Sequence, residues 1–104
     1  YVVKMIHMRA GNRSSLQYHR FKLETNVVIE GEAEVLLEND AYQMESRVIH
    51  AGEGWSVPIG RRHRVIARTD YTAIETSTMH LDDVVRVEDD AGRGDGRIDV
   101  EHSA

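Results

Sequence analysis

Four polar residues in two separate stretches have the types and spacing of a metal site: Gln17, His19, Glu24 and His63. Side chains alternate along a strand, so Gln17 and His19, two positions apart, project to the same face. Two imidazoles, one carboxylate and one amide oxygen suit a divalent ion such as zinc, manganese, iron, nickel or cobalt. Only Glu24 would carry charge, so the bound ion would stay electron-poor and act as a Lewis acid.

The alternative is that these side chains only hydrogen-bond to one another inside the fold. Burying a carboxylate costs several kcal/mol, roughly, unless a cation or a donor compensates it. That cost favours a metal ion at Glu24. The remaining histidines are expected to be surface or packing residues: His7, His50, His80 and His102.

Short strands separated by turns must carry these residues. Runs rich in β-branched and apolar residues, broken by glycine, asparagine and aspartate, predict eight strands. They lie at 2–8, 14–19, 24–30, 33–37, 42–48, 55–58, 63–68 and 72–78. No window before residue 80 has helical periodicity. The pattern predicts an all-β sandwich, jelly roll or barrel.

The chain changes character after residue 80. Residues 81–93 are acidic and are expected to lie across the barrel, with Val84, Val85 and Val87 available to dock. Residues 94–104 are polar and contain glycine, and we expect them to be flexible. A length of 104 residues allows one domain, which we place at 1–93, with 94–104 as its tail.

The two stretches resemble the paired motifs of the cupin superfamily. They read Gly11-x5-Gln17-x-His19-x4-Glu24-x6-Gly31 and Gly52-x5-Pro58-x-Gly60-x2-His63-x3-Ala67. All spacings agree with the family pattern, while Gln17 and Ala67 replace its usual histidine and asparagine. The resemblance implies a cupin double-stranded β-helix, a jelly-roll barrel, over residues 1–93. It also implies that the four residues named first are the metal ligands.

A narrower resemblance comes from Ser15-Leu16-Gln17-Tyr18-His19 and from the segment 82–93. Both are similar to the C-terminal cupin domain of type II mannose-6-phosphate isomerase/mannose-1-phosphate guanylyltransferase. Lys22 stands where that family has an arginine. The resemblance implies metal-dependent aldose–ketose isomerisation of a phosphorylated sugar, in carbohydrate metabolism or polysaccharide biosynthesis. The guanylyltransferase domain is absent from this sequence, so no nucleotidyl transfer is expected of it.

Such an isomerase needs a Lewis acid, a base that moves a proton between adjacent carbons, and cations for the phosphate. We expect Glu75 as the base, with His80 as the alternative. Lys22 and Arg93 are the expected cations, and Arg20 is a further candidate. Lys22, Glu75 and Arg93 are therefore the predicted catalytic residues.

Composition excludes several classes of protein. The net charge of −5 argues against a general nucleic-acid binder, which needs a basic face. No apolar run is long enough for a membrane helix. The absence of cysteine excludes disulfides and thiolate metal sites. We expect a cytoplasmic protein, since the first residues lack the shape of a signal peptide.

Two other functions remain open. The chain could bind a sugar or another small molecule without converting it, and ligand-induced thermal stabilisation with no change in the ligand would show this. It could also be a small metal-dependent dioxygenase, because iron(II) in a histidine–carboxylate site can activate oxygen. A homodimer is expected, because short strands leave sheet edges to be covered.

Overall fold

The computed structural model describes residues 1–79, 84–88 and 96–97, and all regular structure within them is β-strand. The strands are β1 (Val2–Met8), β2 (Leu16–Tyr18), β3 (Glu24–Glu30), β4 (Glu32–Glu38), β5 (Met44–His50), β6 (Gly54–Val57), β7 (His63–Ala67), β8 (Tyr71–Ser77), β9 (Val85–Glu88) and β10 (Gly96–Arg97). The predicted all-β jelly-roll class is confirmed. No helix in the described ranges is long and apolar enough to span a membrane.

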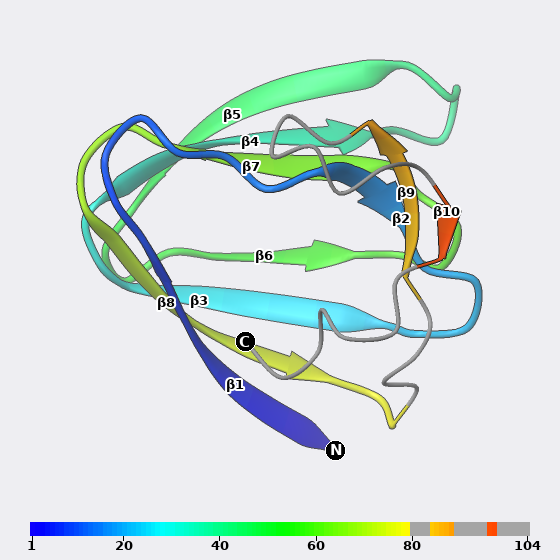
Figure 1. Cartoon of the computed structure of the whole chain (residues 1–104), viewed down its shortest axis with the longest axis horizontal. Coiled ribbons are helices and arrows are strands. Elements are labelled where there is room, and N and C mark those ends of the chain that lie inside the picture. Colours follow the sequence, from blue (N-terminus) through cyan, green and yellow to red (C-terminus); the bar gives the residue numbers. More distant parts are fainter. Residues whose placement is uncertain (80–83, 89–95, 98–104) are drawn as a thin grey trace.

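Two antiparallel sheets face each other (Figure 1). One has the order β1-β8-β3-β6, and the other has the order β10-β9-β2-β7-β4-β5. In Figure 1 the strands β4, β5 and β7 form the upper layer, and β3, β6 and β8 form the lower one. Since strand neighbours are mostly far apart in sequence, the sheets bring distant residues onto one interior surface.

Strand alternation divides each sheet into an inner and an outer face. Along β3 the inward side chains are Glu24, Asn26 and Val28, while the residues between them are exposed. The inward positions therefore change from polar to apolar along one strand. The apolar half is the hydrophobic core, formed by Val28, Ala33, Val35, Ile49, Trp55, Val57, Val65, Ala67, Tyr71 and Ala73. The polar half holds the candidate site.

Strand β2 is shorter than the predicted strand over 14–19. The Ser14 hydroxyl accepts a hydrogen bond from the Val65 amide at 2.9 Å, in place of a backbone carbonyl. Only Gln17 of β2 keeps a ladder pair with β7, opposite His63. A side chain that replaces the backbone partner interrupts the regular ladder, and propensity does not reveal this.

Strand β5 begins two residues later than the predicted strand over 42–48. The Asn39 carboxamide oxygen accepts hydrogen bonds from the amides of Ala41 and Gln43, at 2.9 and 3.0 Å. Tyr42 has a φ of 60°, which belongs to a turn and not to a strand. The asparagine side chain therefore holds residues 39–43 as the hairpin turn.

The segment after residue 80 is described in part. β9 pairs with β2, and Val84 is buried as expected, but Val87 is 39% exposed. Docking through Val87 is wrong, because alternation turns Val84 and Arg86 inward instead. Within the expected tail, Gly96–Arg97 pair with β9 as β10. The domain boundary at residue 93 lies outside the described residues and stays a prediction.

Candidate metal centre

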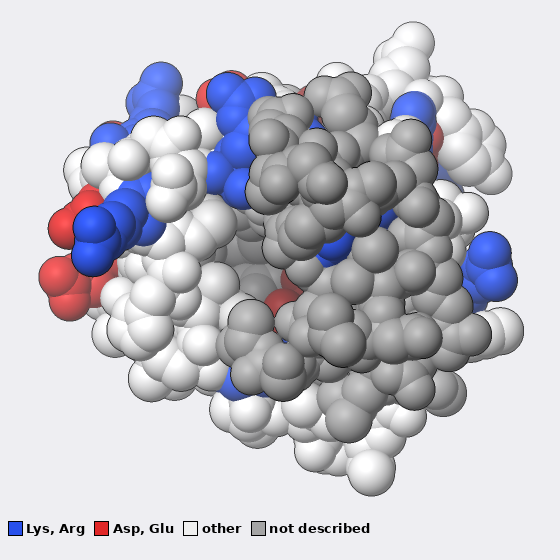
Figure 2. Space-filling view, in the orientation of Figure 1, with Lys and Arg blue, Asp and Glu red and all other residues white. Residues whose placement is uncertain are grey.

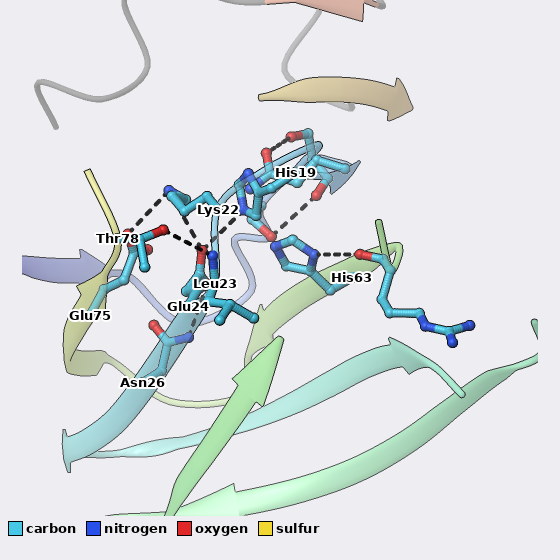
Figure 3. Close-up of polar contacts among 12 residues, drawn as sticks. His19, Lys22, Leu23, Glu24, Asn26, His63, Glu75 and Thr78 are labelled. Carbon is cyan, nitrogen blue, oxygen red and sulfur yellow. Dashed lines mark hydrogen bonds and ion pairs between the residues drawn. The ribbon is translucent and has the colours of Figure 1, made fainter. Parts of the chain in front are cut away.

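The structure brings three of the four predicted ligands together in the polar half of the barrel. We call His19, Glu24 and His63 the triad. Their potential ligand atoms all lie within 4.8 Å of one another, and the residues are 1%, 6% and 2% exposed. His19 directly follows β2, Glu24 begins β3 and His63 begins β7. Figure 3 shows the side chains converging from these separate strands.

His63 is oriented as metal-bound histidines usually are. Its Nδ1 donates a hydrogen bond to the Arg61 carbonyl at 3.1 Å, so its Nε2 carries a lone pair. This Nε2 is buried and has no hydrogen-bond partner within the described residues. Burial lowers the pKa of His63, which keeps the ring neutral. A buried acceptor that is fixed in tautomer and left unsatisfied fits a metal ligand.

Glu24 is held by hydrogen bonds to both oxygens. His19 Nε2 donates to Oε1 at 3.0 Å, and the Asn26 amide donates to Oε2 at 2.9 Å. Burial alone would raise the pKa of Glu24, but the hydrogen bond from His19, together with contributions from His63 and Asn26, lowers it to about 2. Glu24 is thus ionised at neutral pH, as a ligand must be.

A buried lysine connects the triad to a second carboxylate. The Lys22 Nζ lies 3.8 Å from Glu24 Oε1 and 3.5 Å from Glu75 Oε2 (Figure 3). Lys22 is 2% exposed, although its sequence neighbours Arg20 and Phe21 are exposed. Burial raises the pKa of Glu75, the charge of Glu24 raises it further, and Lys22 opposes both effects. Two of the three predicted catalytic residues therefore adjoin the triad.

Gln17 lies beside the triad, and whether it is a ligand stays a prediction. It sits opposite His63 across the β2–β7 pair, so both side chains point to the same face. Its Oε1 accepts a hydrogen bond from the Ser15 hydroxyl at 2.7 Å. A carboxamide oxygen has two lone pairs, so this bond leaves one for an ion and orients the group.

The remaining predicted residues are placed unequally. Arg93 and His80 lie outside the described residues. Arg20 is exposed. Asn26, which holds Glu24, was missed by sequence reasoning. Its position two residues after Glu24 on one strand was the available signal, because it puts both side chains on one face.

The triad borders a cavity of about 1120 Å³. Its lining includes Gln17, Lys22, Glu75, Lys4 and Trp55. Figure 2 shows a hollow in this face of the molecule, with acidic atoms inside it. The Trp55 ring centroid lies 6.3 Å from that of His63. The cavity is large enough for a small polar ligand, with the triad and the Lys22–Glu75 pair in its wall.

Residues 4–80 match the family model described as "Cupin domain". No curated protein sequence shows significant similarity to the chain. Among solved structures, the capsular polysaccharide assembling protein CapF from Staphylococcus aureus is 18% identical with a TM-score of 0.72, over 83% of this chain and 28% of CapF. A recombinant oxalate oxidase in complex with glycolate is 22% identical with a TM-score of 0.64, over 72% of this chain and 39% of the oxidase.

A third similar structure is a proposed sugar phosphate isomerase from Acidithiobacillus ferrooxidans. It is 16% identical with a TM-score of 0.65, over 78% of this chain and 51% of that protein. The chain therefore spans between about a quarter and a half of these three proteins. Identities this low establish a shared fold, and the activities of the larger proteins belong to them.

Proposed function

Because this chain belongs to the cupin domain family, we propose that it binds one divalent ion at the triad and Gln17 and isomerises a phosphorylated sugar. The observation that carries the proposal is the position of Glu75, a second, partly buried carboxylate that contacts Lys22 beside the triad. The similar fold of a proposed sugar phosphate isomerase agrees with it. The sequence resemblance to the type II mannose-6-phosphate isomerases supports the same substrate class.

The ion would polarise the carbonyl or hydroxyl oxygens of an open-chain sugar. Glu75 then takes the proton from the carbon next to the carbonyl and returns it to the neighbouring carbon, through an enediol of the sugar. In the same conversion the hydroxyl proton passes from one sugar oxygen to the other, so that the carbonyl and the hydroxyl exchange places. The raised pKa of Glu75 brings its proton affinity closer to that needed for this transfer near neutral pH. Lys22 holds Glu75 in place and limits the rise of its pKa.

The test follows isotope exchange, which detects even slow turnover. Protein loaded in turn with zinc, manganese, iron(II), nickel or cobalt is incubated with fructose 6-phosphate in deuterated water. Proton transfer through an enediol introduces deuterium at carbon 1 or 2, and NMR reads this directly. Absence of both exchange and interconversion of fructose 6-phosphate and mannose 6-phosphate, with every ion, would rule out isomerisation of these sugars.

Replacing Glu75 by glutamine should remove the base while keeping the shape of the side chain. We expect kcat to fall roughly 100- to 10,000-fold, as for the loss of a general base, with the metal content unchanged. Glu45→Gln, on the exposed part of β5, is the matched control and should keep full activity. Unchanged turnover in Glu75→Gln would assign the proton transfer to another residue.

An oxygen-dependent reaction is the second candidate, favoured by the composition of the triad. Two histidines and one carboxylate are the ligands of many non-haem iron(II) oxygenases, and the oxalate oxidase has a similar fold. Oxygen uptake by the iron-loaded protein, without isotope exchange into a sugar, would favour this function. Thermal stabilisation by a sugar phosphate, with neither reaction, would favour a non-catalytic binding domain.

We also propose that the chain forms a homodimer through the outer face of the β1-β8-β3-β6 sheet. Met5, Ile74 and Val27 form one row across this face, and Met5 and Val27 are 53% and 43% exposed. An exposed apolar row on the outer face of a sheet suits a two-fold symmetric contact.

Val27→Asp should therefore dissociate the dimer, because each copy would bury a carboxylate at the contact. We expect the dissociation constant to rise at least about ten-fold, measured by sedimentation velocity. Met44→Asp, on the other sheet, is the control and should stay dimeric. A Val27→Asp protein that remains a dimer would place the contact elsewhere.

A further inference from the structure

Lys4 occupies a position on the cavity wall that none of the roles above uses. It lies on β1 opposite Glu75 of β8, and Glu75 lies opposite Asn26 of β3. Side chains opposite one another in adjacent strands share a face, so Lys4 belongs to the same inner row as Glu75. Its side chain is partly buried and lines the cavity.

Among the described residues, no salt bridge involves Lys4. Glu75 Oε2 contacts the Lys22 ammonium at 3.5 Å, so the carboxylate next to Lys4 already has a closer cation. Burial lowers the pKa of Lys4, and Glu75 opposes this only in part. A partly desolvated ammonium that has no salt bridge would gain from an anion in the cavity.

The charge of the wall favours the same ligand. The charged residues that line the cavity are Lys4, Arg9, Arg13, Lys22, Glu24, Asp70 and Glu75. Together with a divalent ion at the triad they would carry six positive charges against three negative ones. The two carboxylate oxygens of Glu24 are already hydrogen-bonded, one to His19 and the other to Asn26. The wall beside Lys4 is therefore cationic once the ion is bound, and it would attract a ligand with a strong negative charge.

The spacing between Lys4 and the triad selects the kind of anion. Glu24 lies one inner row away from Lys4, since Val2 and Ser77 share the row of Glu24. Lys4 and Glu24 also lie two strands apart, because β8 runs between β1 and β3. Two residues along a strand span about 6.6 to 6.8 Å and adjacent strands are about 4.8 Å apart, so the two backbone positions are separated by roughly 12 Å. A ligand that reaches both positions needs a metal-binding end and an anionic group separated by several bonds. A sugar with a terminal phosphate has this form. The ammonium of Lys4, on its long flexible side chain, would contact the phosphate.

We infer that Lys4 binds the phosphate group of the sugar substrate, an inference that rests on the proposed function. Lys22 is turned toward the two carboxylates and serves to position them, so the two lysines of the chain have separate tasks. Lys4 would then determine the preference for phosphorylated over free sugars.

The experiment measures binding by calorimetry on the metal-loaded protein, with fructose 6-phosphate and fructose as probes. We expect Lys4→Met to weaken the binding of fructose 6-phosphate at least ten-fold and to leave fructose unaffected. Lys4→Arg keeps the charge and should retain most of the affinity. Arg68→Met removes an exposed cation outside the cavity and is the matched control, which should bind like the wild type. Thermal unfolding establishes that each variant is folded.

The outcomes separate this inference from the proposed reaction. Equal affinity of Lys4→Met and wild type for fructose 6-phosphate would overturn the role of Lys4, while isotope exchange could still show isomerisation. Lys4-dependent binding without isotope exchange would support the role of Lys4 and reject the reaction. If the metal-loaded wild type bound fructose 6-phosphate no better than fructose, the phosphate-binding role would be wrong.

Discussion

Replacing His63 by alanine should abolish stoichiometric metal binding and remove the stability that the ion provides. The buried Nε2 of His63 is the triad atom that has no other partner among the described residues, so no protein contact can replace it. An ion present at a hundred times its Kd raises the free energy of unfolding by about 2.7 kcal/mol. For a domain of this size we expect a fall in Tm of roughly 10–20 °C when that ion is lost.

Elemental analysis and thermal unfolding, with and without a chelator, measure both effects. In the wild type the chelator should lower the Tm, and in His63→Ala it should have no effect. His7→Ala is the control, because His7 is exposed and its Nδ1 is hydrogen-bonded to the Thr72 hydroxyl. One equivalent of metal retained in His63→Ala would contradict the assignment of the site.

Replacing Lys22 by methionine should destabilise the metal-free protein by about 3–5 kcal/mol, the usual cost of removing one partner from a buried ion pair. Lys22 lies between two carboxylates, at 3.8 Å from Glu24 and 3.5 Å from Glu75. Methionine keeps most of the apolar part of the lysine side chain, so the decrease in the free energy of unfolding would come from the lost charge and not from lost packing. Urea unfolding of the metal-free protein measures it.

A double-mutant cycle with Glu75→Gln separates the ion pair from other effects. The double variant should be more stable than Lys22→Met alone, because it leaves one fewer carboxylate without its cation. The decrease in the free energy of unfolding caused by Lys22→Met should also be smaller at pH 5 than at pH 7. The folded-state pKa of Glu75 is already raised, and removing Lys22 raises it further. When the pKa of a group is raised in the folded state, the folded protein becomes less stable as the pH rises through that value.

Additive effects of the two substitutions would show that Lys22 and Glu75 do not interact energetically. The buried lysine would then act only through Glu24 or through its packing. A destabilisation that does not change between pH 5 and pH 7 would lead to the same conclusion, because Glu75 would not be taking up a proton.

Local pattern was sufficient for much of the fold. The predicted strands at 2–8 and 24–30 have the observed bounds of β1 and β3. Both depend on β-branched residues and on turns at neighbouring positions, which are properties of adjacent residues. The spacing of His19, Glu24 and His63 also predicted three side chains that gather, since the motif records positions that one fold brings together.

Strand ends were less predictable where a side chain takes part in the backbone ladder. The Ser14 hydroxyl at the start of β2 and the Asn39 carboxamide before β5 each bind a backbone amide. The sequence composition does not distinguish a serine whose hydroxyl binds a backbone amide of a strand from a serine that is exposed to solvent. The difference depends on which segment lies alongside.

By itself, the sequence determined the all-β class, the metal-site motif and the candidates Lys22 and Glu75. Only the tertiary structure decided that Lys22 is buried between two carboxylates, that Asn26 holds Glu24 and that Lys4 shares a row with Glu75. The physical reason is register. These contacts join strands that are distant in the chain, and a shift of one residue in either strand would turn the side chains to the opposite face.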